Sequence, residues 1–185
     1  MRMEDTICAL STASGMGAIA VIRISGPNTF PLMEKIFVPF SKSHELKKEK
    51  AYSAVLGKIV DEQGQLVDEV LLNLFKGPKS YTGEDVIEIA CHGSIYIQEQ
   101  VLRLLNRNGA RMADPGEYTL RAYINGKMDL SQAEAVADLI ASENKASHQI
   151  ALQHMKGGIS REIKSLRKEL IDFVSLIELE LDFSV

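Results

Sequence analysis

The hydrophobic pattern of the chain changes once, near Asp114, and this change limits the folds that the chain can adopt. Before that point, short apolar runs such as "TICALST" and "AIAVIRISG" alternate with turn-forming stretches, which is typical of strands. After it, apolar residues recur at helical spacing. We therefore expect the α+β fold class, with a mixed α/β part over residues 1–118 and an all-helical part over residues 119–185.

The first part contains patterns for a hairpin and two helices. The stretch "YSAVLGKIVDEQGQLVDEVLLNLFKG" predicts two strands joined by a turn near Gly64. "PNTFPLMEKIF" fits a short helix. "SIYIQEQVLRLLNRNG" carries apolar residues at helical spacing, and Gly109 is the expected stop.

Two helix start signals follow the change of pattern near Asp114. In "DPGE", we expect Asp114 to be the N-cap residue, Pro115 the first helical residue and Glu117 the residue that reaches back to the cap. "DLSQ" repeats this logic, with Asp129 as the cap and Gln132 three residues later. The signals predict two helices in succession, the first ending near Gly126 and the second beginning at Asp129.

The last segment carries a narrow apolar seam that continues over several helical turns. Its residues repeat every three or four positions: Ile159, Ile163, Leu166, Leu170, Phe173, Ile177 and Leu181. A seam of this kind requires partner helices, and the preceding helices can supply only some of them. We therefore expect an incomplete helical domain, either a fragment or the front of a longer domain.

Composition and charge exclude several classes of protein. The net charge of −4 argues against a chain built mainly to grip nucleic acid. Cys8 and Cys91 have neither metal-ligand spacing nor a disulfide framework, so we expect no metal site. No apolar run approaches the roughly 18 residues that a membrane helix needs. We expect a soluble, cytoplasmic protein without a membrane partner.

Two charged residues stand inside apolar strand patterns. Glu88, in "SYTGEDVIEIACHGS", shares a strand face with Val86, Ala90 and His92, and Arg23 is the cation of "AIAVIRISG". Each side chain either faces water or lies in a pocket with a partner. For each residue alone, general burial statistics favour the surface interpretation. The glycine-containing loops on both sides of the Glu88 strand favour a ligand pocket.

"DPGEYTLRAYINGKMDL" is the third candidate stretch. Arg121 lies one helical turn after Glu117 and is expected to pair with it. Lys127 follows a glycine and is interpreted either as a solvent-facing lysine or as a cation directed into a cleft. His92 has no evident partner in the sequence, so we interpret it as a satisfied or exposed histidine. The sequence shows no nucleophile with an activating base, and we assign no catalytic residue.

Four stretches resemble, in order and spacing, the N-terminal half of the MnmE (TrmE) family of tRNA-modification GTPases. They are "AIAVIRISGP", "SYTGEDVIEIACHGS", "ADPGEYTLRAYINGKMDLSQAEAVADLI" and the closing helix. The resemblance implies that the first part has the fold of the folate-binding part of aminomethyltransferases, binds 5-formyltetrahydrofolate and forms a homodimer. It also implies a GTPase domain that is absent here, and only that domain would bind GTP, Mg²⁺ and K⁺.

The resemblance further implies that Arg23, Glu88 and Lys127 are the folate-binding residues. The chemistry is compatible with this, because an ionised carboxylate such as Glu88 can accept two parallel hydrogen bonds from the amino-pyrimidinone edge of a pterin. Arg23 and Lys127 are the candidate cations for the carboxylates and carbonyl oxygens of the folate. Which cation meets which oxygen stays open.

The family also implies a function for the intact protein. With a flavin-dependent partner, MnmG (GidA), it would modify C5 of the wobble uridine (U34) of tRNA, with the folate as one-carbon source. Two alternatives stay open: a structural dimerisation and tRNA-docking module without folate, and an autonomous folate-dependent one-carbon transferase. The sequence contains no P-loop, so this chain alone is expected to have no GTPase activity.

Overall fold

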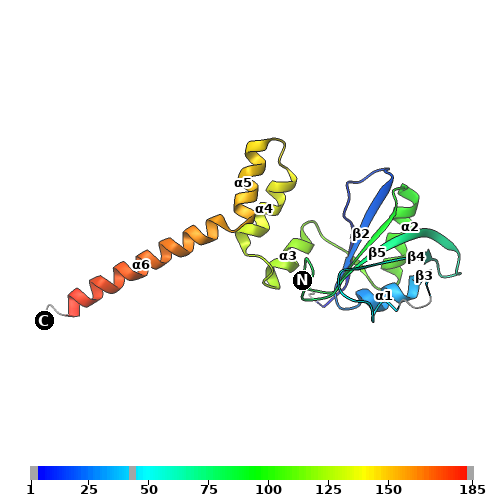
Figure 1. Ribbon diagram of the computed structural model, residues 1–185, viewed down its shortest axis with the longest axis horizontal. Coiled ribbons are helices and arrows are strands. Elements are labelled where there is room, and N and C mark those ends of the chain that lie inside the picture. The colour runs from blue at the N-terminus through cyan, green and yellow to red at the C-terminus, as the bar shows by residue number, and fades with distance from the viewer. Residues whose placement is uncertain (1–3, 42–44, 183–185) are drawn as a thin grey trace. The chain divides into compact units, whose positions relative to one another are not determined.

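The computed structural model of the chain describes residues 4–41 and 45–182, without the side chains of residues 159–161 and 179–182 (Figure 1). The chain divides into two compact units, Met1–Lys127 and Met128–Val185. The first unit contains a sheet with helices and the second only helices, which confirms the α+β class. The units divide after Lys127, later than the 118/119 boundary, because α3 (Glu117–Ile124) is tied to the first unit by its charged side chains.

The first unit is built around one sheet in the described part of the chain. Its strands are β1 (Ile7–Leu10), β2 (Ile19–Ser25), β3 (Phe37–Pro39), β4 (Ser53–Val60), β5 (Leu66–Phe75), β6 (Val86–His92) and β7 (Arg111–Met112). They lie in the order β3-β4-β5-β6-β2-β1-β7. Neighbours are antiparallel except for β1 and β7, which are parallel.

The predicted hairpin is confirmed as β4 and β5. The Oδ1 atom of Asp61 accepts the backbone N–H groups of Gln63 and Gln65, at 2.9 and 2.8 Å. Gly64 has a φ of +76°, a conformation that glycine adopts without a steric penalty. The turn is therefore fixed by a short local sequence, which is why it could be predicted.

Helices α1 (Thr29–Ile36) and α2 (Ile95–Arg107) share one apolar core with the sheet, so they cover the same face of it. Alternate strand residues point into this core, and they include Ile22, Ile24, Leu72, Leu74, Ile87 and Ile89, each fully buried. Burying each such side chain stabilises the fold by about 1.5–3 kcal/mol. The residues between them, including Arg23 and Glu88, belong to the opposite face.

Helix α3 begins later than the sequence predicted. The structure starts it at Glu117, after Gly116, whose φ of +76° lies outside the helical region. Asp114 and Pro115 therefore precede the helix, and the prediction of Asp114 as N-cap was wrong. The backward reach is confirmed, because Oε2 of Glu117 accepts the backbone N–H of Asp114 at 2.8 Å.

The second unit consists of α4 (Leu130–Ile140), α5 (Lys145–Met155) and α6 (Gly158–Asp182), with α4 and α5 side by side in Figure 1. The predicted cap of α4 is confirmed, since the Asp129 side chain accepts the N–H of Gln132 and the Gln132 side chain accepts that of Asp129. Asn144 and Ser147 form the same reciprocal arrangement at α5. These caps satisfy N–H groups that a helix start leaves without partners.

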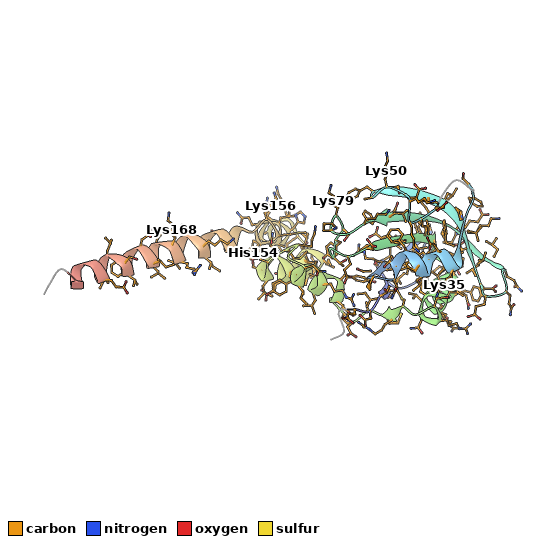
Figure 2. All side chains as sticks on the ribbon, turned by 90° about the horizontal axis from the view of Figure 1, so that it is seen from below. Lys35, Lys50, Lys79, His154, Lys156 and Lys168 are labelled. Atoms are coloured by element: carbon orange, nitrogen blue, oxygen red, sulfur yellow. The ribbon has the colours of Figure 1, made fainter. Side chains whose placement is uncertain are left out.

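Helix α6 exposes the apolar seam that the sequence predicted. The exposed fractions of Ile163, Leu166, Leu170, Phe173 and Ile177 lie between 42% and 59%. The side chains of Ile159 and Leu181 lie outside the described residues. Lys168 also stands out from α6 in Figure 2. None of the described helices is both long enough and apolar enough to cross a membrane.

Candidate functional site

Arg23 and Glu88 lie opposite each other on the neighbouring strands β2 and β6, on the sheet face away from α1 and α2. The Nε and Nη2 atoms of Arg23 donate to Oε1 of Glu88 at 3.0 and 2.7 Å. Their side chains are 24% and 23% exposed. Within the described residues, no hydrogen bond reaches Oε2 of Glu88. The carboxylate therefore has a protein partner on one oxygen and a second oxygen available to a ligand.

Two tyrosines border this ion pair. The guanidinium carbon of Arg23 lies 5.2 Å from the ring centroid of Tyr81 and 5.5 Å from that of Tyr118, within the range of cation–π attraction. The hydroxyl of Tyr118 donates to the backbone carbonyl of Arg23 at 2.6 Å, and burial raises the pKa of this phenol. The hydroxyl of Tyr81 lies 2.9 Å from Oγ1 of Thr119. The pair thus has an aromatic border.

Sequence reasoning missed both tyrosines. Tyr81 precedes β6 in a loop, and Tyr118 lies in α3, so neither belongs to the strands that carry the ion pair. The sequence does not show that this loop and this helix both fold against β2. The contacts of the two tyrosines with Arg23 therefore could not be predicted.

A second group of charges, the buried charge cluster, has a buried centre and a partly exposed rim. It joins Asp5, Glu84, Arg111, Glu117 and Arg121, of which Arg111 and Asp5 are 40% and 24% exposed. Arg121 Nη2 binds Asp5 at 2.6 Å and Glu117 at 3.1 Å, and its Nη1 binds Glu84 at 3.1 Å. Arg111 binds Glu117 at 2.6 Å and Asp5 at 2.7 Å. The side chains of Arg121 and Glu117 are fully buried. The predicted pair of Arg121 and Glu117 is confirmed, but it is part of this larger network.

The cluster favours the charged form of two of its carboxylates, those of Asp5 and Glu117. The hydrogen bond from Arg111 lowers the pKa of Asp5 against the opposing effect of burial, and Arg121 adds to the lowering. Burial by itself would raise the pKa of Glu117. The hydrogen bonds from Arg111, from the N–H of Asp114 and from Arg121 outweigh it, so this pKa also lies below its usual range. The buried charges are thus mutually compensated.

Lys127, the third predicted site residue, has a different environment from Arg23 and Glu88. Its Nζ donates to the backbone carbonyl of Pro78 at 2.8 Å. In the described part of the chain, no hydrogen bond or ion pair links it to the other two. It contacts the loop of residues 77–85, the same loop that carries Tyr81. Of the three predicted residues, Arg23 and Glu88 therefore bind each other directly. Lys127 instead contacts the loop that carries Tyr81.

His92 is both satisfied and exposed. Its Nδ1 lies 2.7 Å from Oδ1 of Asp68, whose Oδ2 accepts the backbone N–H of His92, while the ring is 68% exposed. The buried thiols of Cys8 and Cys91 are free, and burial raises the pKa of each to about 11. Among the described residues, no group of three or more His, Cys, Asp or Glu side chains could hold a metal ion.

Comparison with known families finds two matches in succession. Residues 6–127 match the model described as "GTP-binding protein TrmE N-terminus", and residues 130–185 match the "MnmE helical domain". Among curated proteins, the tRNA modification GTPase MnmE of Flavobacterium johnsoniae is 61% identical over 100% of this chain and 39% of its own length. That of Parabacteroides distasonis is 56% identical over 97% of this chain and 39% of its own length. The chain thus spans about two fifths of the length of these relatives.

Proposed function

Because the chain belongs to the MnmE (TrmE) family of tRNA modification GTPases, we propose that its first unit binds 5-formyltetrahydrofolate at Arg23 and Glu88. The observation that carries this proposal is the partly exposed ion pair of these residues beside two tyrosine rings. An ion pair with one free carboxylate oxygen suits a ligand that offers N–H donors, and aromatic rings suit a flat heterocycle.

Glu88 is the residue proposed to recognise the pterin. Its Oε2 can accept one N–H of the amino-pyrimidinone edge, and its Oε1, now bound only to Arg23, can accept the adjacent one. Arg23 keeps the carboxylate compensated while this happens. Burial of the edge would strengthen both hydrogen bonds, because water no longer competes for them.

Lys127 is proposed to bind the carboxylates of the folate tail. Its ammonium group is exposed and donates to the carbonyl of Pro78. An ammonium group carries three donors, so one bond to a carbonyl leaves capacity for a carboxylate. A charge-assisted bond to a carboxylate is also about twice as strong as a bond between neutral groups. The folate, when bound, supplies a one-carbon unit, and this chain's residues hold and orient it.

For the intact protein we propose the activity that the names of its relatives state, tRNA modification by a GTPase. In this proposal the protein is a cytoplasmic homodimer that works with the flavin-dependent MnmG (GidA) on C5 of the wobble uridine. GTP, Mg²⁺ and K⁺ would bind outside this chain. GTP hydrolysis by this chain alone would contradict the proposal, because the sequence lacks a P-loop.

Calorimetric titration with 5-formyltetrahydrofolate tests the site. We expect the wild-type chain to bind and Glu88→Ala to lose about 30- to 100-fold in affinity, as for the loss of two charge-assisted hydrogen bonds. The matched control is Glu69→Ala, which removes an exposed carboxylate of β5 that pairs with Lys58 at 3.7 Å. We expect this control to bind normally.

The outcomes separate the proposal from its alternatives. Unchanged affinity in Glu88→Ala would remove the pterin assignment. A wild-type chain that binds no folate but sediments as a dimer would favour the purely structural module. Conversion of the folate by this chain alone would favour an autonomous transferase. Far-UV circular dichroism of each variant checks that the fold is retained.

A further inference from the structure

Glu84 connects the loop of residues 77–85 to the buried charge cluster. Both of its carboxylate oxygens are engaged: Nη1 of Arg121 lies 3.1 Å from Oε1 and 3.3 Å from Oε2. The hydroxyl of Ser25 also donates to Oε2, at 2.6 Å. The side chain is only 15% exposed. Glu84 is therefore occupied by protein partners and is not itself a ligand-binding group.

The two partners of Glu84 lie next to the residues that surround the proposed folate site. Ser25 follows Arg23 by two residues on the same face of β2. Arg121 lies about one helical turn after Tyr118 in α3. Glu84 itself is three residues from Tyr81. One carboxylate thus joins the three segments that bring Arg23 and its two tyrosines together.

Neutral bonds hold the segment between Tyr81 and Glu84. The hydroxyls of Thr82 and Ser25 lie 2.7 Å apart, and Asn125 donates to the carbonyl of Thr82 at 2.7 Å. Charge-assisted bonds at the start of the loop, from Lys127 to the carbonyl of Pro78 and from the Gly77 N–H to Asp85, do not reach this segment. Next to Tyr81, Glu84 therefore contributes the charge-assisted bonds, which are about twice as strong as neutral ones. The loop should therefore depend on Glu84 more than on any of these neutral contacts.

The charges of the cluster allow this dependence to be tested without unfolding the protein. The cluster contains three carboxylates, from Asp5, Glu84 and Glu117, and two guanidinium groups, from Arg111 and Arg121. Replacing Glu84 by the isosteric glutamine leaves two charges of each sign. The buried Arg121 would keep two carboxylate partners, so the cluster can remain compensated.

We propose that Glu84 is a positioning residue, which holds the 77–85 loop against Arg121 and Ser25 so that Tyr81 lies against Arg23. Its effect on a ligand rests on the proposed folate function, whereas its effect on the loop does not. Glu84 acts through Tyr81, because Tyr81 is the loop residue whose ring contacts Arg23.

The first experiment measures amide hydrogen exchange in the ligand-free chain. In Glu84→Gln we expect the amides of residues 79–84 to exchange about tenfold faster, because local opening becomes easier, while the amides of β5 stay unchanged. The matched control is Glu99→Gln, which alters an exposed carboxylate paired with Arg103 at 3.3 Å on α2. This control should leave the loop unchanged.

The second experiment is a double-mutant cycle with 5-formyltetrahydrofolate as the probe. We expect Glu84→Gln to lower affinity by about tenfold in the wild-type background, and by less than about twofold in the Tyr81→Ala background. A merely structural role would produce the same loss in both backgrounds and would overturn the proposal. Normal affinity in Glu84→Gln would overturn it as well.

The two experiments distinguish this inference from the proposed function. If the wild-type chain binds no folate, the proposed function fails, and the exchange experiment alone decides on Glu84. Faster exchange confined to the loop would then support the positioning of the loop. Exchange at the wild-type rate would overturn it.

Discussion

The first unit contains two guanidinium–carboxylate sites that differ in their access to water. Arg23 and Glu88 are each about one quarter exposed, whereas Arg121 and Glu117 are fully buried. At the exposed pair, water can solvate either partner if the other leaves, so the pair adds little stability. In the buried cluster, a lost partner leaves a charge without compensation. The same chemistry therefore gives a site that can exchange partners and a site that cannot.

This difference assigns separate tasks to the two sites. The exposed pair can turn one carboxylate oxygen towards a ligand at low cost. The buried charge cluster fixes the segments around that pair, since it joins residue 5, the 77–85 loop, β7 and α3. The buried charge cluster therefore holds together segments that surround the pair of Arg23 and Glu88.

Removal of Arg121 is expected to have the largest effect on stability. We expect Arg121→Met to lower the free energy of unfolding by about 3–5 kcal/mol, because Glu84 loses its cation and Asp5 and Glu117 are left with Arg111 alone. Urea unfolding followed by tyrosine fluorescence measures this, since the chain has no Trp and its tyrosines all lie in the first unit. Arg103→Met, at an exposed pair, is the control and should change little. A loss below about 1 kcal/mol in Arg121→Met would contradict the role assigned to burial.

Acid should affect the buried cluster next most strongly. Asp5 and Glu117 have pKa values below their usual range in the folded chain. The stability that they contribute is therefore present above the unfolded-state pKa values, near 4, and is lost as the pH falls through the lower folded values. Each proton taken up on unfolding can change the free energy of unfolding by at most about 1.4 kcal/mol per pH unit.

Urea unfolding at pH 5, 4 and 3 checks this expectation. The wild-type chain should lose stability over that range, and Asp5→Asn should show a shallower dependence because one of the titrating carboxyls is gone. A dependence as steep in Asp5→Asn as in the wild type would show that other carboxyls cause the acid sensitivity.

The smallest change in stability is expected at the exposed pair. Glu88→Ala should alter the free energy of unfolding by no more than about 1 kcal/mol, because water reaches both side chains of this partly exposed pair. The same variant is the one expected to lose most folate affinity. Thermal unfolding compared with calorimetric titration would show whether stability and binding separate. A destabilisation as large as that of Arg121→Met would remove the distinction between the two sites.

The sequence predicted those features that depend on neighbours along the chain. The turn at Gly64, the cap at Asp129 and the pair of Glu117 with Arg121 each involve residues within a few positions of one another. The alternation of strand faces also placed Glu88 on one face with Val86, Ala90 and His92. These features follow from the two-residue alternation of side chains along a strand and from hydrogen bonds between residues close in sequence.

The remaining features depend on register and long-range contacts. Arg23 and Glu88 are 65 residues apart, and period alone does not specify which residue of β2 lies opposite Glu88. The contact of Glu84 with Arg121 forms only when the 77–85 loop is folded, so the sequence did not indicate it. Helix α3 began late because Gly116 left the helical region, a preference that the cap pattern concealed. The assignment of Arg23, Glu88 and Lys127 to folate stays a prediction.

The bonds of Asp5 have a consequence for synthesis on the ribosome. Asp5 binds Arg111 and Arg121, which follow it by 106 and 116 residues. The first strand, β1, likewise pairs with β7, whose residues are made about one hundred positions later. During synthesis, Asp5 therefore remains without these two partners until α3 has emerged from the ribosome. The first unit can close only when almost all of it has been translated, and its folding should be slow for its size because its decisive contacts are so distant in sequence.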